Sequence, residues 1–148
     1  MNDIKVVSVN ISEKKGVIKK PVERINITNS GVEHDAHAGD WHRQISLLAK
    51  ESIEKFEKIL GRKLEYGEFA ENITTEGVVL HKMTPGDIIK IADVELEVTQ
   101  IGKECHGAGC AIFSQVGKCV MPKEGIFAKV LKTGTIKPGD YIIVETKK

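Results

Sequence analysis

Short runs of β-branched residues alternate with polar breaks in the first part of the chain. Residues 4–11, 16–18 and 24–28 are rich in valine and isoleucine, and charged or small polar residues separate them. Branched side chains favour the extended backbone, and short runs bounded by polar residues are typical of strands. The pattern therefore predicts a β-rich start to the chain.

The spacing of the apolar residues changes between positions 49 and 60. Ile53, Phe56, Ile59 and Leu60 recur at intervals of one helical turn, and Gly61 follows them. This period places apolar side chains on one side of a helix, and glycine is common just after a helix ends. The sequence predicts a principal helix over residues 49–60.

The second half returns to strand-like patterns. Residues 88–91 and 94–98 are apolar or alternate apolar with charged positions, and only Ala92 and Asp93 separate them, which predicts a hairpin. A second Pro-Gly-Asp turn at 138–140 introduces the β-branched run 141–144, as the first such turn introduces the hairpin.

Together these elements predict a mainly β fold in a single domain spanning residues 1–148. Many short strands, Gly-rich turns and one principal helix favour a barrel-like architecture, closed or partly closed, with further short helical turns. Closure would remove the exposed strand edges that such a chain otherwise carries.

Composition narrows the classes of function. The 148 residues carry a formal net charge of only +1, so no global field would attract nucleic acid. The sequence holds no apolar run of membrane-spanning length and no secretory pattern at its start, so we expect a cytoplasmic protein without a membrane partner. All three cysteines fall within residues 105–119, a clustering that points to metal binding or thiol chemistry in a reducing compartment.

A histidine-rich loop occupies residues 31–43. His34, Asp35, His37 and Asp40 could ligate a metal, although their spacing matches no zinc pattern. These side chains could instead bind backbone groups at tight turns, as histidine and aspartate often do in loops. A third interpretation is an anion cradle in which Arg43 and loop N–H groups bind phosphate.

Two later segments also contain candidate site residues. In residues 67–77, Asn72, Thr74 and Thr75 could bind a ligand or could satisfy the backbone at turns and strand ends. In residues 100–110, Cys105 lies between Lys103 and His106, whose positive charge would favour the thiolate.

The thiol of Cys105 fits three roles: a nucleophile, a sulfur carrier or a ligand for a soft metal. Two alternatives remain open. Cys105 could be a buried structural cysteine, or it could form a zinc site with His106, Cys110 and Cys119, although adjacent ligands and the lack of a C-x-x-C pair do not favour zinc.

The order and the residue sequences of these segments resemble those of the MOSC domains, named for the molybdenum cofactor sulfurase C-terminal domain. GDWH at 39–42 and QISLL at 44–48 resemble the family's histidine loop and the strand after it. EFAENITTEG at 68–77 resembles its GENLTTEG phrase, with Ala70 at the usual glycine. Residues 86–100 resemble the strand pair before the family's cysteine, and CVMPKEGIFAKV at 119–130 resembles the small, stand-alone bacterial branch.

The resemblance implies a β-barrel-like domain that binds the molybdenum–pterin cofactor, with Cys105 as the catalytic residue and the molybdenum ligand. The implied cofactor-binding residues are His37, His42, Arg43, Asn72, Thr74 and Lys103. Lys103 stands where many family members have arginine, and lysine lacks the planar fork that arginine offers phosphate. We expect His37, His42, Asn72 and Cys105 to line one cleft.

The resemblance leaves several functions open. Some MOSC proteins reduce N-hydroxylated substrates with electrons from a reductase partner, and others are proposed persulfide carriers that a cysteine desulfurase would load. A cofactor chaperone without turnover is a third option, and pyridoxal phosphate binding is also attached to the family. The sequence contains no flavin or nicotinamide fingerprint, so a reductive reaction would need an electron-donating partner.

Overall fold

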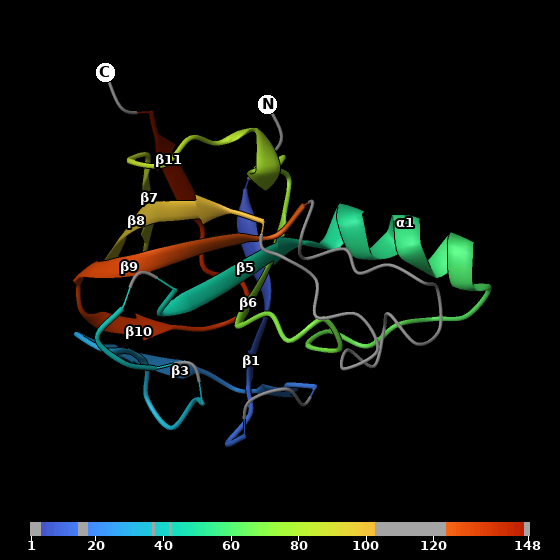
Figure 1. Ribbon diagram of the computed structural model, residues 1–148, viewed down its shortest axis with the longest axis horizontal. Helices are drawn as coiled ribbons and strands as arrows, with labels where there is room; N and C mark the ends of the chain where they lie inside the picture. The colour runs from blue at the N-terminus through green and yellow to red at the C-terminus, as the bar shows by residue number, and fades with distance from the viewer. Residues whose placement is uncertain (1–3, 15–17, 37, 42, 103–123, 147–148) are drawn as a thin grey trace.

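The computed structural model describes residues 4–14, 18–36, 38–41, 43–102 and 124–146 (Figure 1). The elements, in chain order, are β1 (Lys5–Ile11), β2 (Lys20–Val22), β3 (Ile25–Thr28), β4 (Gly31–Val32), β5 (Ile45–Ala49), α1 (Lys50–Leu60), β6 (Ile73–Glu76), the 3-10 helix η1 (Leu80–Lys82), β7 (Ile88–Ile91), β8 (Val94–Ile101), β9 (Ile126–Lys132), β10 (Gly134–Ile136) and β11 (Ile142–Glu145). The mainly β class with one principal helix is confirmed.

The strands form two sheets. The larger has the order β11-β7-β8-β9-β5-β6-β1-β2, and the smaller has the order β10-β3-β4. The ladders are antiparallel except that of β5 with β6, where Leu47 lies opposite Ile73. Parallel neighbours need a crossover connection, and α1 lies within this one. The crossover brings β6, in the second half of the 68–77 segment, beside β5, the strand that follows the histidine loop.

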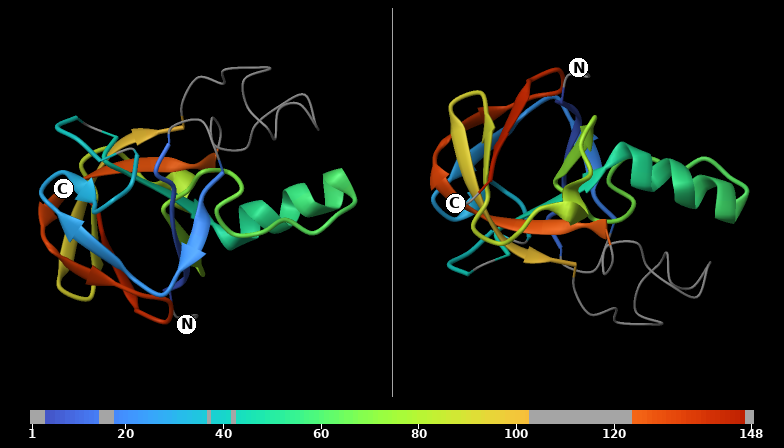
Figure 2. Two further views of the ribbon diagram at one scale, coloured as in Figure 1. Left: turned by 90° about the horizontal axis from the view of Figure 1, so that it is seen from below. Right: turned by 90° about the horizontal axis from the view of Figure 1, so that it is seen from above.

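The sheets curve around a common interior without closing into one ring. Seen end-on in Figure 2, the strands surround a central region and α1 projects to one side. In the described part of the chain the two sheets share no ladder, and a single bridge between Lys5 and Tyr141 connects β1 with the residue before β11. The barrel-like shape is therefore present, whereas a fully closed barrel is not.

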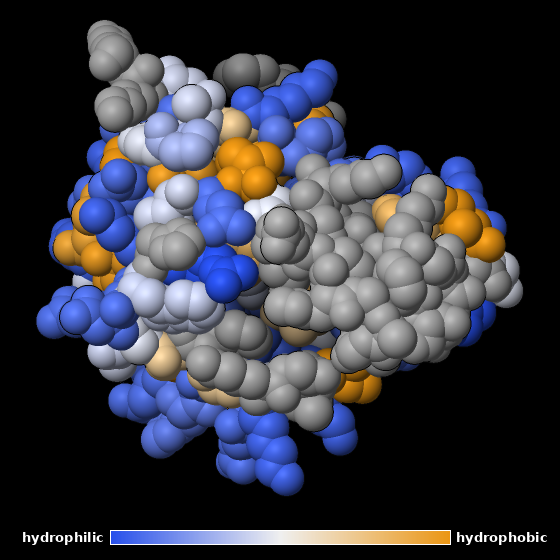
Figure 3. Space-filling view, viewed as in Figure 1, coloured by the Kyte–Doolittle hydropathy of each residue, from blue (hydrophilic) through white to orange (hydrophobic). Residues whose placement is uncertain are grey.

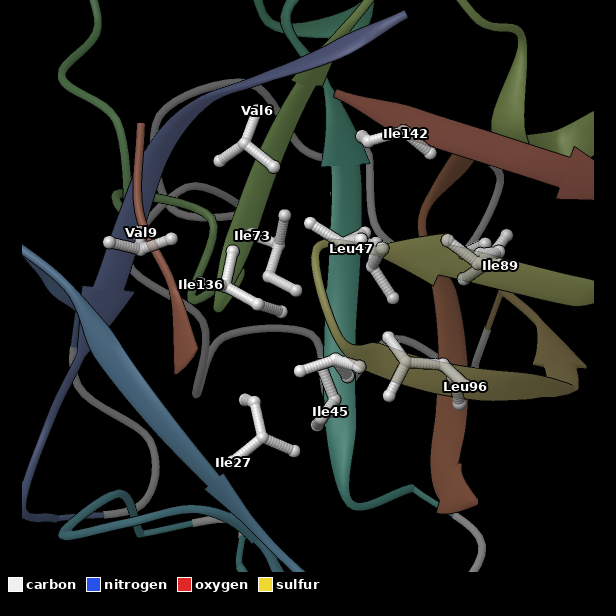
Figure 4. Close-up of a cluster of buried hydrophobic side chains, with 14 of the residues drawn as sticks. Val6, Val9, Ile27, Ile45, Leu47, Ile73, Ile89, Leu96, Ile136 and Ile142 are labelled. Atoms are coloured by element: carbon white, nitrogen blue, oxygen red, sulfur yellow. The ribbon is translucent and has the colours of Figure 1, made fainter. Parts of the chain in front are cut away.

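The main core fills this interior. Val6, Ile45, Leu47, Ile73 and Leu96 come from four strands, β1, β5, β6 and β8, and point toward one another (Figure 4). A second cluster lies on the outer face of β5, under α1 and the loop after it, and consists of Leu48, Ile53, Phe56, Leu64, Phe69 and Phe127. Because β5 is covered on both faces, all five of its residues are buried.

The predicted helix is confirmed with one correction to its buried face. Gly61 ends α1 in the left-handed conformation, with φ of 71°, and its N–H donates to the carbonyl of Glu57 at 2.9 Å. Ile53 and Phe56 are buried as the period predicts, but Ile59 is 54% exposed. The helix leaves the sheet toward its C-terminal end, so the last turn has little to pack against (Figure 1).

The predicted hairpin is also confirmed. The end of its second strand and the position of the strand near residue 18 differ from expectation. Ala92 adopts a positive φ of 52° in the two-residue turn, and β8 continues to Ile101 beyond the predicted end at 98. Residues 16 and 17 of the predicted strand at 16–18 lie outside the described part of the chain, and β2 covers Lys20–Val22. The sequence pattern did not predict β4, β6, β9 or β10 as strands.

Exposed hydrophobic side chains are dispersed over the surface. On the face shown in Figure 3, the hydrophobic residues form small separate patches between hydrophilic ones. None of the helices in the described part of the chain has the length and apolar character needed to span a membrane.

Candidate functional site

The structure describes three of the seven residues predicted for the site: Arg43, Asn72 and Thr74. His37, His42, Lys103 and Cys105 lie outside the described residues, as do His106, Cys110 and Cys119. Within the described ranges, no group of three or more His, Cys, Asp or Glu side chains is arranged to hold a metal ion. The zinc and histidine-loop metal hypotheses therefore gain no support from the described part.

Asn72 joins two strands. Its Oδ1 accepts from the backbone N–H of Ser46 at 3.0 Å and from the Ser46 hydroxyl at 3.2 Å, and its Nδ2 donates to the Asn10 carbonyl at 3.2 Å. The residue is fully buried. Because both ends of the amide are bonded to protein, the side chain here holds β5 against the end of β1, and its role toward a ligand stays a prediction.

Thr74 belongs to a second buried group, with Glu71 and Asn10. The Thr74 hydroxyl donates to Glu71 Oε2 at 2.7 Å and accepts from Asn10 Nδ2 at 3.2 Å. The backbone N–H of Gly67 also donates to Glu71 Oε2, at 3.0 Å. All three side chains are fully buried. Thr74 thus stabilises the segment internally, and a direct contact with cofactor also stays a prediction.

Glu71 is the acidic residue of this group, and its pKa is strongly shifted. Burial raises the pKa of its carboxyl to about 7, although the hydrogen bonds from Gly67 and Thr74 oppose that shift. Its Oε1 is buried without a hydrogen-bond partner among the described residues. Glu71 is therefore close to its titration midpoint at neutral pH, and no local sequence pattern anticipates this.

A buried ion pair links the histidine loop to the start of β2. Lys19 Nζ lies 2.8 Å from Asp35 Oδ1, and neither side chain has exposed surface. Ser12 contributes two bonds: its N–H donates to Asp35 Oδ1 at 3.0 Å and its hydroxyl accepts from Lys19 Nζ at 3.1 Å. Asp35, one of the candidate metal ligands, is thus bound to a lysine.

The backbone of Gly67 lies close against the backbone carbonyl of Lys19. The Gly67 φ is 92°, and a Cβ added there would lie 2.4 Å from the Lys19 carbonyl oxygen. We expect Gly67→Ala to lower the free energy of unfolding by about 2–3 kcal/mol, because it combines left-handed strain with a backbone clash. Urea denaturation of the variant measures this.

Gly139→Ala is the matched control for that substitution. Gly139 has a similar φ of 95°, but nothing lies within 4 Å of an added Cβ, so only the strain remains. Equal losses in the two variants would show that the close approach to Lys19 has no energetic consequence.

Arg43 lies at the end of the histidine loop, against two aromatic rings. Its Cζ is 4.7 Å from the Trp41 ring centroid and 5.6 Å from that of Phe127. Its Nε is buried without a hydrogen-bond partner among the described residues. No carboxylate of the described residues forms an ion pair with it. The rings therefore fix the direction of the guanidinium, and its Nε donor is not used by any residue that the structure describes.

The described residues on either side of the 103–123 segment lie close to one another. Gly102, just after β8, donates its N–H to the Gly125 carbonyl at 2.7 Å. Ile126, the next residue, lies opposite Leu47 of β5, and Phe127 lies opposite Ser46. The two ends of the 103–123 segment are thus anchored on β8 and β9, beside the strand that follows Arg43.

A pocket of about 390 Å³ lies near the same anchor, at the start of α1. Inside it the Glu124 carboxylate binds Lys55 and accepts from the Ser52 hydroxyl at 2.7 Å, and His81 Nδ1 is 4.0 Å away. Burial alone would raise the pKa of Glu124, but the bonds from Lys55 and Ser52 outweigh it and hold this pKa below its usual value. The carboxylate is ionised, and its charge is compensated within the pocket.

Sequence reasoning missed Lys19, Ser46, Glu71 and Asn10. Isolated lysine, serine and asparagine residues in a sequence are usually exposed, and only the fold shows that these are buried and bonded together. Glu71 and Ser46 carried a signal, because they lie within the EFAENITTEG and QISLL segments that match the family.

Comparisons with solved structures show the same fold. The YuaD protein from Bacillus subtilis superposes with a TM-score of 0.80 at 17% identity, covering 99% of this chain and 98% of that one. YiiM from Geobacillus stearothermophilus gives 0.74 at 24% identity, covering 95% and 74%, and YiiM from Escherichia coli gives 0.69 at 17% identity, covering 100% and 72%.

The comparison with curated proteins gives no match. The family comparison matches the MOSC domain model over residues 33–143, a span that includes most of the histidine loop, the EFAENITTEG phrase and all three cysteines. This match covers most of the chain, and the fold agrees with it. The chain therefore belongs to the MOSC domain family, which is associated with the molybdenum cofactor.

Proposed function

We propose that this protein binds the molybdenum–pterin cofactor and that the Cys105 sulfur is directed at its molybdenum. The environment of Arg43 is the observation that carries the proposal. A guanidinium with a buried, unpartnered Nε and no carboxylate among its described neighbours is suited to a phosphate, which accepts two parallel N–H bonds from arginine. The cofactor's phosphate supplies such a group.

The described residues that flank the Cys105 segment support the same site. Cys105 follows Gly102 by three residues, and three residues of chain reach at most about 11 Å. Gly102 is bonded to Gly125, the preceding Ile101 lies opposite Ile126, and Phe127 contacts Arg43. An anion held at Arg43 and a thiol at Cys105 are therefore compatible with a single elongated ligand.

Each residue has a proposed role. Arg43 binds the phosphate, Lys103 adds positive charge, and Cys105 supplies a soft thiolate for molybdenum. His37 and His42 contact the cofactor from the histidine loop, while Asn72 and Thr74 fix the strands under the site through their buried bonds. The cofactor would supply two-electron chemistry, such as reduction of an N–O bond, with electrons from a reductase partner.

The Arg43 role is tested by binding to apoprotein. We expect Arg43→Ala to weaken the affinity for cofactor released from a molybdoenzyme by about 10- to 100-fold, because a charge-assisted bidentate contact is lost. Pterin fluorescence on titration measures the affinity. Arg43→Lys should recover only part of it, since lysine lacks the fork.

Arg24→Ala is the control, because Arg24 is an exposed arginine outside the segments that match the family's site. Equal affinity of the Arg43→Ala and Arg24→Ala variants would contradict the phosphate role. Absence of any cofactor binding, together with a persulfide formed on Cys105 by a cysteine desulfurase, would instead support the sulfur-carrier function.

A further inference from the structure

The buried Lys19–Asp35 pair lies where three segments meet. Asp35 belongs to the histidine loop, Lys19 lies just before β2, and the Lys19 N–H donates to the Gly67 carbonyl at 2.8 Å. Ser12, at the end of β1, binds both members of the pair and also accepts from the Ala36 N–H at 2.8 Å. One ion pair thus connects the two segments that the family resemblance singles out.

From Asp35 the contacts lead to Arg43. The Asp35 carbonyl accepts from the Ala38 N–H at 3.2 Å. The carbonyl of the following residue, Gly39, accepts from Gln44 Nε2 at 2.8 Å. Gln44 Oε1 in turn accepts from the Val130 N–H at 2.8 Å, which fixes the side chain to β9. The direction of the neighbouring Arg43 therefore depends on how this loop is seated.

From Lys19 the contacts lead to the other segment. The Gly67 N–H donates to Glu71 Oε2, and Glu71 binds Thr74, which binds Asn10. The Asn10 N–H donates to the Asn72 carbonyl at 2.7 Å. A continuous chain of buried polar contacts thus runs from the histidine loop, through Lys19, to the EFAENITTEG segment.

A buried ion pair is a poor means of gaining net stability. Removing both charges from water costs several kcal/mol, and their attraction roughly offsets that cost, so neutral replacement of a whole pair is often tolerated. The pair does, however, disfavour other arrangements, because each charge is strongly penalised when it is separated from the other. Its main effect should then be on geometry.

We propose that Lys19 and Asp35 are positioning residues that seat the histidine loop, and with it Arg43, on the 67–77 segment. The part of this proposal that concerns cofactor affinity rests on the proposed function; the part that concerns the loop does not. Neither residue needs to touch the cofactor.

The test uses Lys19→Met combined with Asp35→Asn in the full chain. The double variant removes both charges, and the amide introduced in place of the Asp35 carboxylate keeps an oxygen that can accept from the Ser12 N–H. We expect the melting temperature to stay within about 5 °C of the parent. The amides of Ala36, Ala38 and Gly39 should exchange with solvent at least about 10-fold faster, measured by NMR, and cofactor affinity should fall by about 10-fold.

Lys90→Met with Glu145→Gln is the matched control, since this pair is 2.8 Å apart on the exposed surface, with 37% and 52% of the side chains exposed. It should change none of the three readouts. Unchanged exchange of the loop amides in the Lys19/Asp35 double variant would overturn the proposal, as would a loss of more than about 10 °C in melting temperature, which would assign the pair to bulk stability. If the parent protein binds no cofactor, the proposed function fails while the exchange result still decides the positioning role.

Discussion

Lys19→Met alone should lower the free energy of unfolding by about 3–5 kcal/mol. The substitution leaves the Asp35 carboxylate without the ammonium 2.8 Å away, at a position with no exposed surface. A buried charge that loses its ionic partner is left with bonds such as that from the Ser12 N–H, which offset only part of its desolvation cost, and this single loss is a large part of the stability of a domain of this size. Urea denaturation at neutral pH measures the change.

An exposed ion pair provides the comparison. Lys137 Nζ lies 2.7 Å from Asp140 Oδ1, but 65% of the Lys137 side chain is exposed. Lys137→Met should therefore cost less than about 1 kcal/mol. A Lys19→Met variant no less stable than Lys137→Met would show that water or another cation compensates Asp35, and the buried-pair description would be wrong.

Glu71→Gln should remove a pH dependence of about 3 kcal/mol from the free energy of unfolding. Burial raises the pKa of the Glu71 carboxyl from 4.5 to about 7, so the folded state binds this proton more tightly than the unfolded state does. The resulting stability is fully present below pH 4.5 and is lost as the pH rises toward and through 7. At about 1.4 kcal/mol per pKa unit, the difference between the unfolded and folded pKa of Glu71 corresponds to the pH dependence of about 3 kcal/mol.

Urea denaturation from pH 4.5 to 8 tests this in the parent and the variant. The parent should lose stability relative to Glu71→Gln as the pH rises, because glutamine stays neutral and can still accept from Gly67 and Thr74. Glu65→Gln, at an exposed position, is the control and should parallel the parent. Parallel curves for the parent and Glu71→Gln would mean that Glu71 is ionised at no cost in the fold.

The elements that the sequence predicted are those whose side chains follow a simple period. Helix α1 has Ile53 and Phe56 on its buried face and Gly61 at its end, and the β7–β8 hairpin alternates apolar with charged residues around a two-residue turn. In both cases short-range spacing determines which side is buried.

Strand β6 shows why other elements were missed. Its residues Thr74 and Thr75 are as buried as Ile73, and neighbours distant in the sequence, such as Asn10, satisfy the Thr74 hydroxyl. A polar residue that is buried through long-range bonds looks the same in a sequence as one in a solvated turn. The local pattern of this segment is therefore equally compatible with a turn.

In the candidate site, too, some residues could be identified from the sequence, whereas their contacts could not. The resemblance identified Asn72, Thr74 and Arg43. Only the fold separates the first two, which are bonded within the protein, from Arg43, whose Nε has no partner among the described residues. Lys19 and Asp35 form a pair across sixteen positions of sequence, and nothing in either local pattern signals the other. Contacts of this kind depend on how the loops are seated.

The most direct test of the account is the molybdenum and pterin content of protein purified from molybdenum-replete cells. Mass spectrometry of the metal and fluorescence of the oxidised pterin should give the two in near-equal amounts for the parent protein. Cys105→Ser should keep pterin but lose molybdenum, because serine is a poor ligand for a soft metal site. Parent protein that carries neither molybdenum nor pterin, and takes up neither when cofactor is added, would contradict the account.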